Sequence, residues 1–128
     1  MANQRIRSYR AFWPFYVLQH RRPATRQLHF VGTSGALILI ALALTLPQSW
    51  LYLAAPVSGY LFTWIGHFWV EKNRPATFTY PIFSLIGDFH MYGLMWLARM
   101  DGEVACCAAK GAKETGPEKA FSYPNRSR

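Results

Sequence analysis

The chain has 128 residues, a net charge of +8 and 52% hydrophobic residues, a length that suits a single domain. The 44 residues between Arg26 and Glu71 contain no Lys, Arg, Asp or Glu, and a soluble domain rarely runs so far without charge because its helices need a solvated face. Since the basic residues flank this block and form no polar surface of their own, the pattern argues against a nucleic-acid partner.

The first 28 residues are basic and aromatic. They predict a short helix that lies at the membrane surface while its arginines reach the lipid headgroups. The apolar residues of this helix are Phe12, Trp13, Phe15, Tyr16 and Leu18. Pro23 is expected to break the chain after it.

The uncharged block is long enough for two membrane crossings, because a crossing helix needs about 20 apolar residues. The first crossing is predicted from Leu28 to Leu46 and the second from Trp50 to Val70, with a turn at Pro47–Ser49. Gly32 and Gly35 form a notch of small residues in the first crossing. Another helix, in this chain or in a homo-oligomer, can approach closely there.

A third apolar segment runs from Tyr80 to Leu97 and includes Asp88 and His90, so we expect it to be half-buried or interfacial. Residues 101–128 are polar and lack apolar periodicity, which predicts disorder. The expected organisation is therefore one membrane-embedded domain over residues 1–100, followed by a disordered polar tail over residues 101–128.

These elements predict an all-α integral membrane bundle, in which a two-crossing hairpin is joined by an N-terminal interfacial helix and a third half-buried helix. Basic residues lie on both flanks of the hairpin and none lies at its turn. The positive-inside rule then predicts a multi-pass protein with its N-terminus and the Pro75 loop in the cytoplasm. The membrane would be the inner membrane of a bacterium or the endoplasmic reticulum of a eukaryote.

Three of the four histidines are expected to meet at the cytoplasmic mouth of this bundle. His29 opens the first crossing and His67 closes the second, so the hairpin brings both to the same depth. His20 lies just before Pro23 and can fold back onto them. Ionisable groups at membrane depth usually mark function, and neutral imidazole is the commonest metal ligand. The pattern therefore predicts a metal site.

Glu71 follows His67 by four residues, so on a helix both side chains project from one face. A set of imidazoles and a carboxylate suits non-haem iron with open positions, and Glu71 is a candidate fourth ligand or a group that orients His67. His90 is a further candidate metal ligand. Asp88 and His90 are two residues apart and face opposite ways on a helix, so at most one joins the site. Asp88 would otherwise cap a helix or pair with Arg74.

Three sequence blocks contain the candidate ligands. They are Phe15–His20 (FYVLQH), Arg26–Thr33 (RQLHFVGT) and Gly66–Ala76 (GHFWVEKNRPA). Their joint spacing resembles that of the membrane-bound 2-hydroxy fatty acid dioxygenase family, over roughly residues 8–100. The third segment, Ser84–Met91, departs from the fungal form of that family, so the resemblance does not identify the substrate.

The resemblance implies an iron(II)-dependent α-oxidation, in which a 2-hydroxy fatty acid and O2 give carbon dioxide and a fatty acid one carbon shorter. It implies catalytic roles for His20, His29, His67 and Glu71 around a non-haem Fe2+. The acyl chain of the substrate would stay in the bilayer or in a groove between the helices while its headgroup meets the iron.

Two other functions stay open from the sequence. His29 and His67 on paired helices can be the axial ligands of a b-type haem, although both lie at helix ends and Glu71 would then have no role. A non-catalytic membrane scaffold would bind partner helices through Gly32 and Gly35 and would hold no metal. An optical spectrum and a metal analysis separate these alternatives.

Overall fold

The computed structural model describes residues 5–119, with the backbone alone for residues 112 and 114–119. Within this range the regular structure is helical and no strand occurs. The elements are α1 (Tyr9–Leu18), α2 (Pro23–Thr45), α3 (Leu51–Ile65), the π-helical η1 (Gly66–Glu71), the 3-10 helix η2 (Ala76–Phe78), α4 (Pro81–Trp96) and α5 (Met100–Lys119). The predicted all-α class is confirmed.

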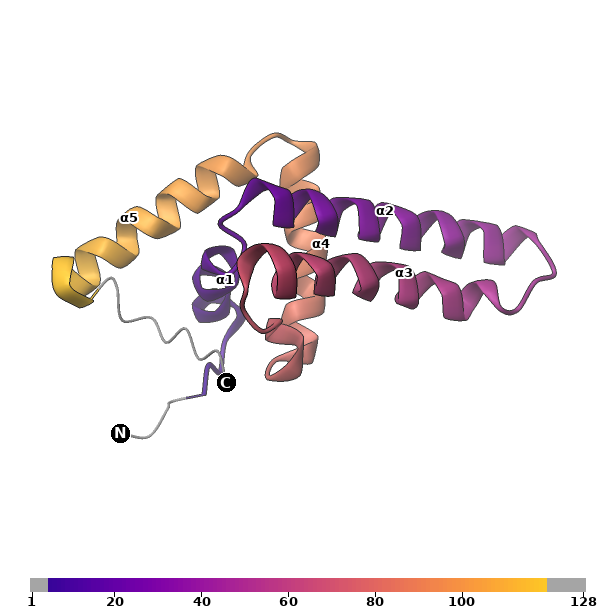
Figure 1. Ribbon diagram of the computed structural model, residues 1–128, viewed down its shortest axis with the longest axis horizontal. Coiled ribbons are helices and arrows are strands. Elements are labelled where there is room, and N and C mark those ends of the chain that lie inside the picture. The colour runs from indigo at the N-terminus through magenta and orange to yellow at the C-terminus, as the bar shows by residue number, and fades with distance from the viewer. Residues whose placement is uncertain (1–4, 120–128) are drawn as a thin grey trace.

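The helices α2 and α3 lie side by side as an antiparallel hairpin, joined by a tight turn at one end of the molecule (Figure 1). The helix α2 begins at Pro23 and not at the predicted Leu28. Proline is favoured at the first helical position, because the N–H group that it lacks would have no partner inside the helix. The second helix continues from α3 directly into η1, so one helical rod runs from Leu51 to Glu71. The hairpin is therefore present much as the apolar pattern predicts.

Among the described residues, α2 is the one helix that is long and apolar enough by itself to cross a membrane. The 15 residues of α3 fall short of the roughly 17–25 that a crossing needs, and a spanning length is reached only together with η1. The structure thus supports one candidate membrane span, and a two-crossing bundle remains a prediction.

The notch at Gly32 and Gly35 is filled by α3. A Cβ atom on Gly32 would lie 2.9 Å from the Phe62 Cβ and 3.0 Å from the Gly59 carbonyl oxygen, and one on Gly35 would lie 2.7 Å from the Ser58 Oγ. Small residues let two helix backbones approach closely. The notch therefore pairs the two arms of the hairpin, and it is not free for a partner helix as the scaffold hypothesis requires.

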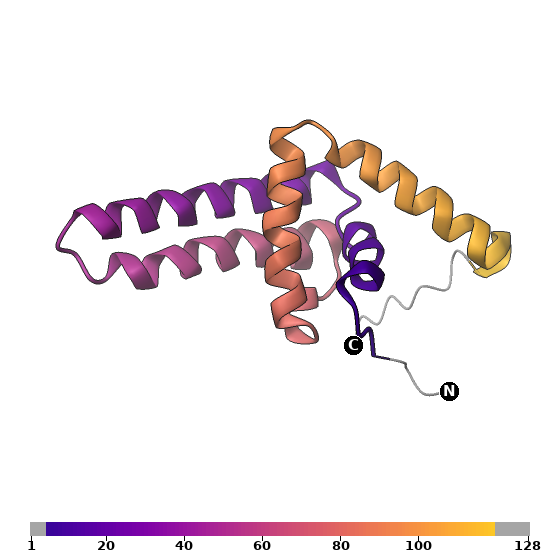
Figure 2. The same cartoon turned by 180° about the vertical axis from the view of Figure 1, so that it is seen from behind.

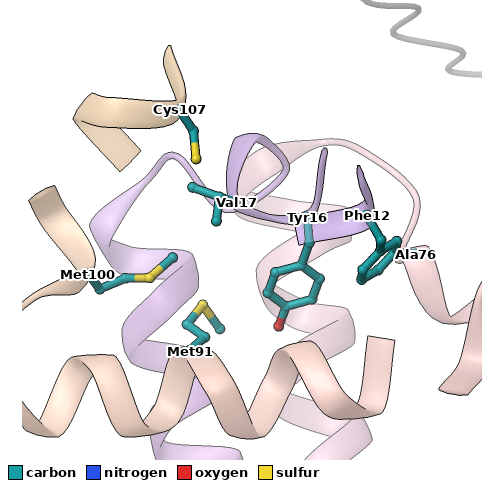
Figure 3. Packing of buried hydrophobic residues seen from close by; sticks show 7 residues of the cluster. All are labelled: Phe12, Tyr16, Val17, Ala76, Met91, Met100 and Cys107. Atoms are coloured by element: carbon teal, nitrogen blue, oxygen red, sulfur yellow. The ribbon is translucent and has the colours of Figure 1, made fainter. Parts of the chain in front are cut away.

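The other helices gather at the open end of the hairpin, which we call the base. There α4 runs across the hairpin and α1 lies beside it, while α5 extends away (Figures 1 and 2). A buried apolar cluster joins α1, α4 and α5 at the base (Figure 3). It consists of Phe12, Tyr16, Val17, Ala76, Met91, Met100 and Cys107. This cluster fixes α1 and α4 against the ends of the hairpin.

The third apolar segment forms α4 with nearly its predicted bounds and is half-buried. One face of α4 packs inward through Ser84, Gly87 and Met91. The opposite face leaves large apolar side chains exposed, including Ile82 and Phe89. An amphipathic helix of this kind fits the predicted interfacial position.

The prediction of disorder from Asp101 onward is wrong for Asp101–Lys119, which are helical, whereas residues 120–128 lie outside the described part. The first turns of α5 contact the rest of the molecule: Asp101 pairs with Arg26, and the Glu103 carboxylate accepts a hydrogen bond from the Trp13 indole at 3.1 Å. Two acidic side chains also suit the positive end of the helix dipole. The division into a domain and a tail at residue 100 stays a prediction.

Candidate metal centre

Three histidines from separate segments converge inside the base. His20 follows α1, His29 lies on α2 and His67 lies in η1, and all three are at most 2% exposed. The Nε2 atom of His29 lies 3.1 Å from that of His20 and 3.3 Å from that of His67. One ligand atom from each of the three lies within 4.8 Å of the others. The convergence expected from the hairpin topology is therefore present.

The π-helical turn η1 brings His67 to this point. Close packing between Gly66 and Thr25 puts η1 against the start of α2, since a Cβ on Gly66 would lie 3.1 Å from the Thr25 Cγ2. The turn ends at Lys72, which has a left-handed φ of 57°, and the Asn73 N–H donates to the His67 carbonyl at 2.9 Å. Such π-helical turns occur frequently at functional sites.

Hydrogen bonds to the opposite ring nitrogen orient two of the three imidazoles. Nδ1 of His20 lies 2.7 Å from the Tyr16 carbonyl oxygen, and Nδ1 of His67 lies 2.7 Å from the Asn73 Oδ1. The Asn73 amide nitrogen donates in turn to the Gln19 carbonyl at 3.1 Å, which fixes the orientation of the amide. Because these oxygens only accept, each Nδ1 carries the proton and each Nε2 points a lone pair into the cluster.

The three-histidine cluster fits a divalent metal ion. Because Nε2 of His20 and Nε2 of His67 both offer a lone pair, their close approach to Nε2 of His29 needs either a proton on that nitrogen or a cation between the three rings. A metal held about 2.0–2.1 Å from imidazole nitrogens separates neighbouring nitrogens by about 2.8–3.4 Å for angles from octahedral to tetrahedral. The observed 3.1 and 3.3 Å fall in this range. Three protein ligands would leave coordination positions open, as catalytic metal sites do.

The protonation state of His20 also suits metal binding. Burial, and then the neighbouring His29 and His67, lower the pKa of His20 well below its ordinary value of 6.5. Desolvation disfavours the charged imidazolium, so the ring is neutral at pH 7 and can offer its lone pair.

Glu71 lies outside this cluster, in contrast to its predicted position. Its carboxylate accepts a hydrogen bond from the backbone N–H of Arg22 at 2.7 Å, at the N-cap of α2. The free N–H groups and the dipole of a helix N-terminus attract a carboxylate. Asn73, and not Glu71, contacts Nδ1 of His67.

His90 also lies apart from the three-histidine cluster. Its ring is exposed and stacks on Trp13, with centroids 3.8 Å apart, and its Nδ1 lies 2.9 Å from the Tyr9 hydroxyl. These contacts hold His90 against α1. Asp88, on the same helix, lies beside His29, which agrees with the expectation that at most one of the two residues reaches the site.

Of the residues that support the cluster, the sequence patterns indicated only Asp88, as an alternative to His90, and they indicated no such role for Tyr16 or Arg26. One Asp88 carboxylate oxygen lies 3.5 Å from Nδ1 of His29 and accepts a hydrogen bond from the Tyr16 hydroxyl. Burial, and then the charge of Asp88, raise the pKa of Tyr16 well above 10.0, so the phenol stays protonated and donates. Arg26 is buried and donates to the His20 carbonyl at 2.8 Å. An acidic residue in an apolar segment is a signal that could have found Asp88.

The fold and the site together define an all-helical protein with a buried group of three histidines that can hold a metal ion. Residues 6–100 match the 2-hydroxy-palmitic acid dioxygenase Mpo1-like family, and the chain belongs to that family. This finding confirms the resemblance seen in the three sequence blocks. Neither the curated proteins nor the solved structures gave a match to the chain.

Proposed function

We propose that this protein is a membrane-embedded, iron(II)-dependent dioxygenase that shortens 2-hydroxy fatty acids by one carbon. The family name points to a 2-hydroxy fatty acid as the substrate. In the proposed reaction, the substrate and O2 give the shorter fatty acid, carbon dioxide and water, so that the bond between C1 and C2 breaks and C2 becomes the new carboxyl carbon. The convergence of three Nε2 atoms is the observation that carries this proposal.

His20, His29 and His67 would hold the iron through Nε2. Imidazole ligands suit non-haem iron(II), and iron held here would supply the activation of O2 and an attraction for the hydroxyl and carboxylate oxygens of the substrate. The chain supplies the orientation of the rings, because the Tyr16 carbonyl and the Asn73 amide hold two of them by hydrogen bonds. Burial of all three rings keeps bulk water away from the reacting atoms.

The cluster geometry favours this mononuclear site over the b-type haem alternative. The axial ligands of a haem lie on opposite faces of its macrocycle. Nitrogens of His29 and His67 that lie 3.3 Å apart leave no space for a macrocycle between them. His20, at 3.1 Å from His29, occupies the same region.

We also propose that the α2–α3 hairpin inserts into the bilayer with the base at the cytoplasmic surface. Away from the base the hairpin exposes large apolar side chains such as Ile38, Leu44 and Leu53, and the chain between Arg26 and Glu71 carries no charge. Basic residues near the base would face the cytoplasm. The histidines would then lie near the membrane surface, where the headgroup of a fatty acid meets the protein while its acyl chain stays in lipid.

Purified full-length protein in detergent tests this function. We expect bound iron(II) and an oxygen-dependent conversion of 2-hydroxypalmitic acid to the fatty acid one carbon shorter, measured by mass spectrometry. His29→Ala and His67→Ala should each remove most of the iron and the activity. His90→Ala is the matched control, because it removes an exposed histidine outside the cluster, and it should retain both. Iron that survived the loss of His29 and His67 together would contradict the proposed site.

A further inference from the structure

We propose that Asp88 is a positioning residue for His29, an assignment that rests on the proposed metal centre. One carboxylate oxygen of Asp88 lies 3.5 Å from Nδ1 of His29, the ring nitrogen opposite to the one in the cluster. The His29 side chain is 2% exposed, and within the described structure its Nδ1 has no hydrogen-bond partner. Of the three rings, His29 is therefore the one whose Nδ1 has no hydrogen bond to orient it.

The chemistry of a metal-bound imidazole requires an acceptor at this position. A neutral histidine that gives Nε2 to a metal keeps its proton on Nδ1, and a buried N–H without an acceptor is destabilising. His20 and His67 already have oxygen acceptors at 2.7 Å. The distance from Nδ1 of His29 to the Asp88 carboxylate oxygen is only about 0.5 Å longer than a normal N–H···O hydrogen bond. A small rotation of the His29 ring would therefore form this bond.

Tyr16 holds the Asp88 carboxylate in this position. Its hydroxyl donates to the same oxygen that faces His29, and Figure 3 shows the phenol pointing from the apolar cluster toward α4. The Tyr16 ring stacks on His20 with centroids 4.2 Å apart, and its carbonyl orients that histidine. One residue of α1 therefore supports two ligands, His20 directly and His29 through Asp88.

Gly87 explains how α4 comes close enough for this contact. A Cβ atom at Gly87 would lie 3.1 Å from two ring atoms of Tyr16, which is tighter than ordinary van der Waals contact. With glycine there, the helix lies directly against the phenol ring, and the next residue places its carboxylate between Tyr16 and His29. The packing of α4 on α1 is thus coupled to the orientation of a ligand on α2.

The position of Asp88 makes it a supporting group and not a fourth ligand. Its oxygen lies on the Nδ1 side of His29, whereas the cluster lies on the Nε2 side. A carboxylate bonded to the outer nitrogen of a ligating histidine fixes the ring and raises its basicity. Loss of such a partner typically lowers metal affinity or activity by about 10- to 100-fold.

Cobalt(II) titration of the full-length protein tests this assignment, because the visible spectrum of bound cobalt(II) reports on the geometry of its ligands. Asp88→Ala should weaken binding by about 10- to 100-fold and change the spectrum. Asp88→Asn, whose amide oxygen can still accept, should restore most of the affinity, while Tyr16→Phe should weaken it. Ser84→Ala is the matched control, because it removes a buried hydroxyl from α4 that bonds to Thr77 away from the cluster.

Wild-type affinity and spectrum in Asp88→Ala would overturn the assignment, as would an equal loss in Ser84→Ala. If Asp88→Ala did not fold, Tyr16→Phe would decide: weakened cobalt binding supports the assignment, and wild-type binding overturns it. The failure of the metal centre itself has a different signature. In that case the wild-type protein would bind no cobalt(II), or binding would survive the loss of His29 and His67 together.

Discussion

At the base of the hairpin the buried side chains include histidine, threonine and arginine, whereas farther along α2 and α3 the exposed side chains are isoleucine and leucine. His20, His67 and Thr25 are at most 1% exposed, but Ile38 is 60% and Leu53 71% exposed. Soluble domains usually show the opposite distribution, with few polar side chains buried. A large exposed apolar patch is rare on their surface and marks an interaction site.

The two regions are therefore stabilised by different interactions. At the base, buried polar groups are tolerated because they bond to one another, as Asn73 does to His67 and Arg26 to the His20 carbonyl. The outer hairpin has close backbone packing at Gly32 and Gly35 on its inner side and apolar side chains on its outer side. A bilayer is the solvent in which such an outer surface is stable.

The strongest test of this contrast places a charge on the outer hairpin. Ile38→Arg should cost about 2.5–3.5 kcal/mol if the middle of α2 lies in the bilayer, but should stay within about 0.5 kcal/mol if the surface faces water. We expect the membrane-bound fraction of expressed protein to fall sharply, as measured by fractionation. Gln27→Arg adds the same charge at an exposed position near the base and should leave insertion unchanged. Equal behaviour of the two variants would contradict the proposed insertion.

A smaller loss of stability is expected from Gly32→Ala, at the point where the hairpin leaves the base. Gly32→Ala would place a Cβ 2.9 Å from the Phe62 Cβ and 3.0 Å from the Gly59 carbonyl, and overpacking of this kind costs about 1–3 kcal/mol. Thermal unfolding in detergent measures the loss. Gly93→Ala is the control, because a Cβ there has no heavy atom within 4 Å, and it should be neutral or stabilising by up to about 1 kcal/mol. A neutral Gly32→Ala would show that the arms of the hairpin are loosely paired.

Apolar runs and charge asymmetry are local signals, which is why the sequence alone predicted α2, α3 and α4 and the meeting of His29 with His67. The sequence indicated Asp88 only as an alternative to His90, and it did not indicate the support from Asn73, because both contacts depend on how α4 and the chain after η1 pack on α1. The helical spacing of Glu71 was a sound argument in isolation. In the structure Asn73 contacts Nδ1 of His67, and the N-terminus of α2 offers the Glu71 carboxylate a competing donor.

The helix α5 was missed for a related reason. Low apolar content predicts disorder on average, but composition cannot predict a few specific side-chain contacts that hold a helix in place. Here an ion pair with Arg26 and a hydrogen bond from Trp13 hold the first turns of α5 to the base.

The ion pair between Arg26 and Asp101 should contribute the least of these interactions. The guanidinium of Arg26 is buried, but the Asp101 side chain is 89% exposed. The pair is therefore not a fully buried one, for which the loss of one partner lowers the free energy of unfolding by about 3–5 kcal/mol. Asp101→Ala should lower the free energy of unfolding by at most about 1 kcal/mol, with less effect at high salt. Arg26 keeps two acceptors in that variant, the His20 carbonyl at 2.8 Å and the Arg21 carbonyl at 2.6 Å.

Arg26→Ala is the informative partner variant, since it leaves both of these carbonyls without their donor at the point where the chain carries His20 into the cluster. The His20 carbonyl is buried, and a buried acceptor left unsatisfied costs about 1–3 kcal/mol, whereas the Arg21 carbonyl is only partly buried and water can replace its donor. Arg26→Ala should therefore be clearly less stable than Asp101→Ala and should also bind metal more weakly. Denaturant unfolding and a cobalt(II) titration of the two variants measure both effects. Equal losses would mean that Arg26 acts chiefly through α5, and that this helix is an integral part of the base.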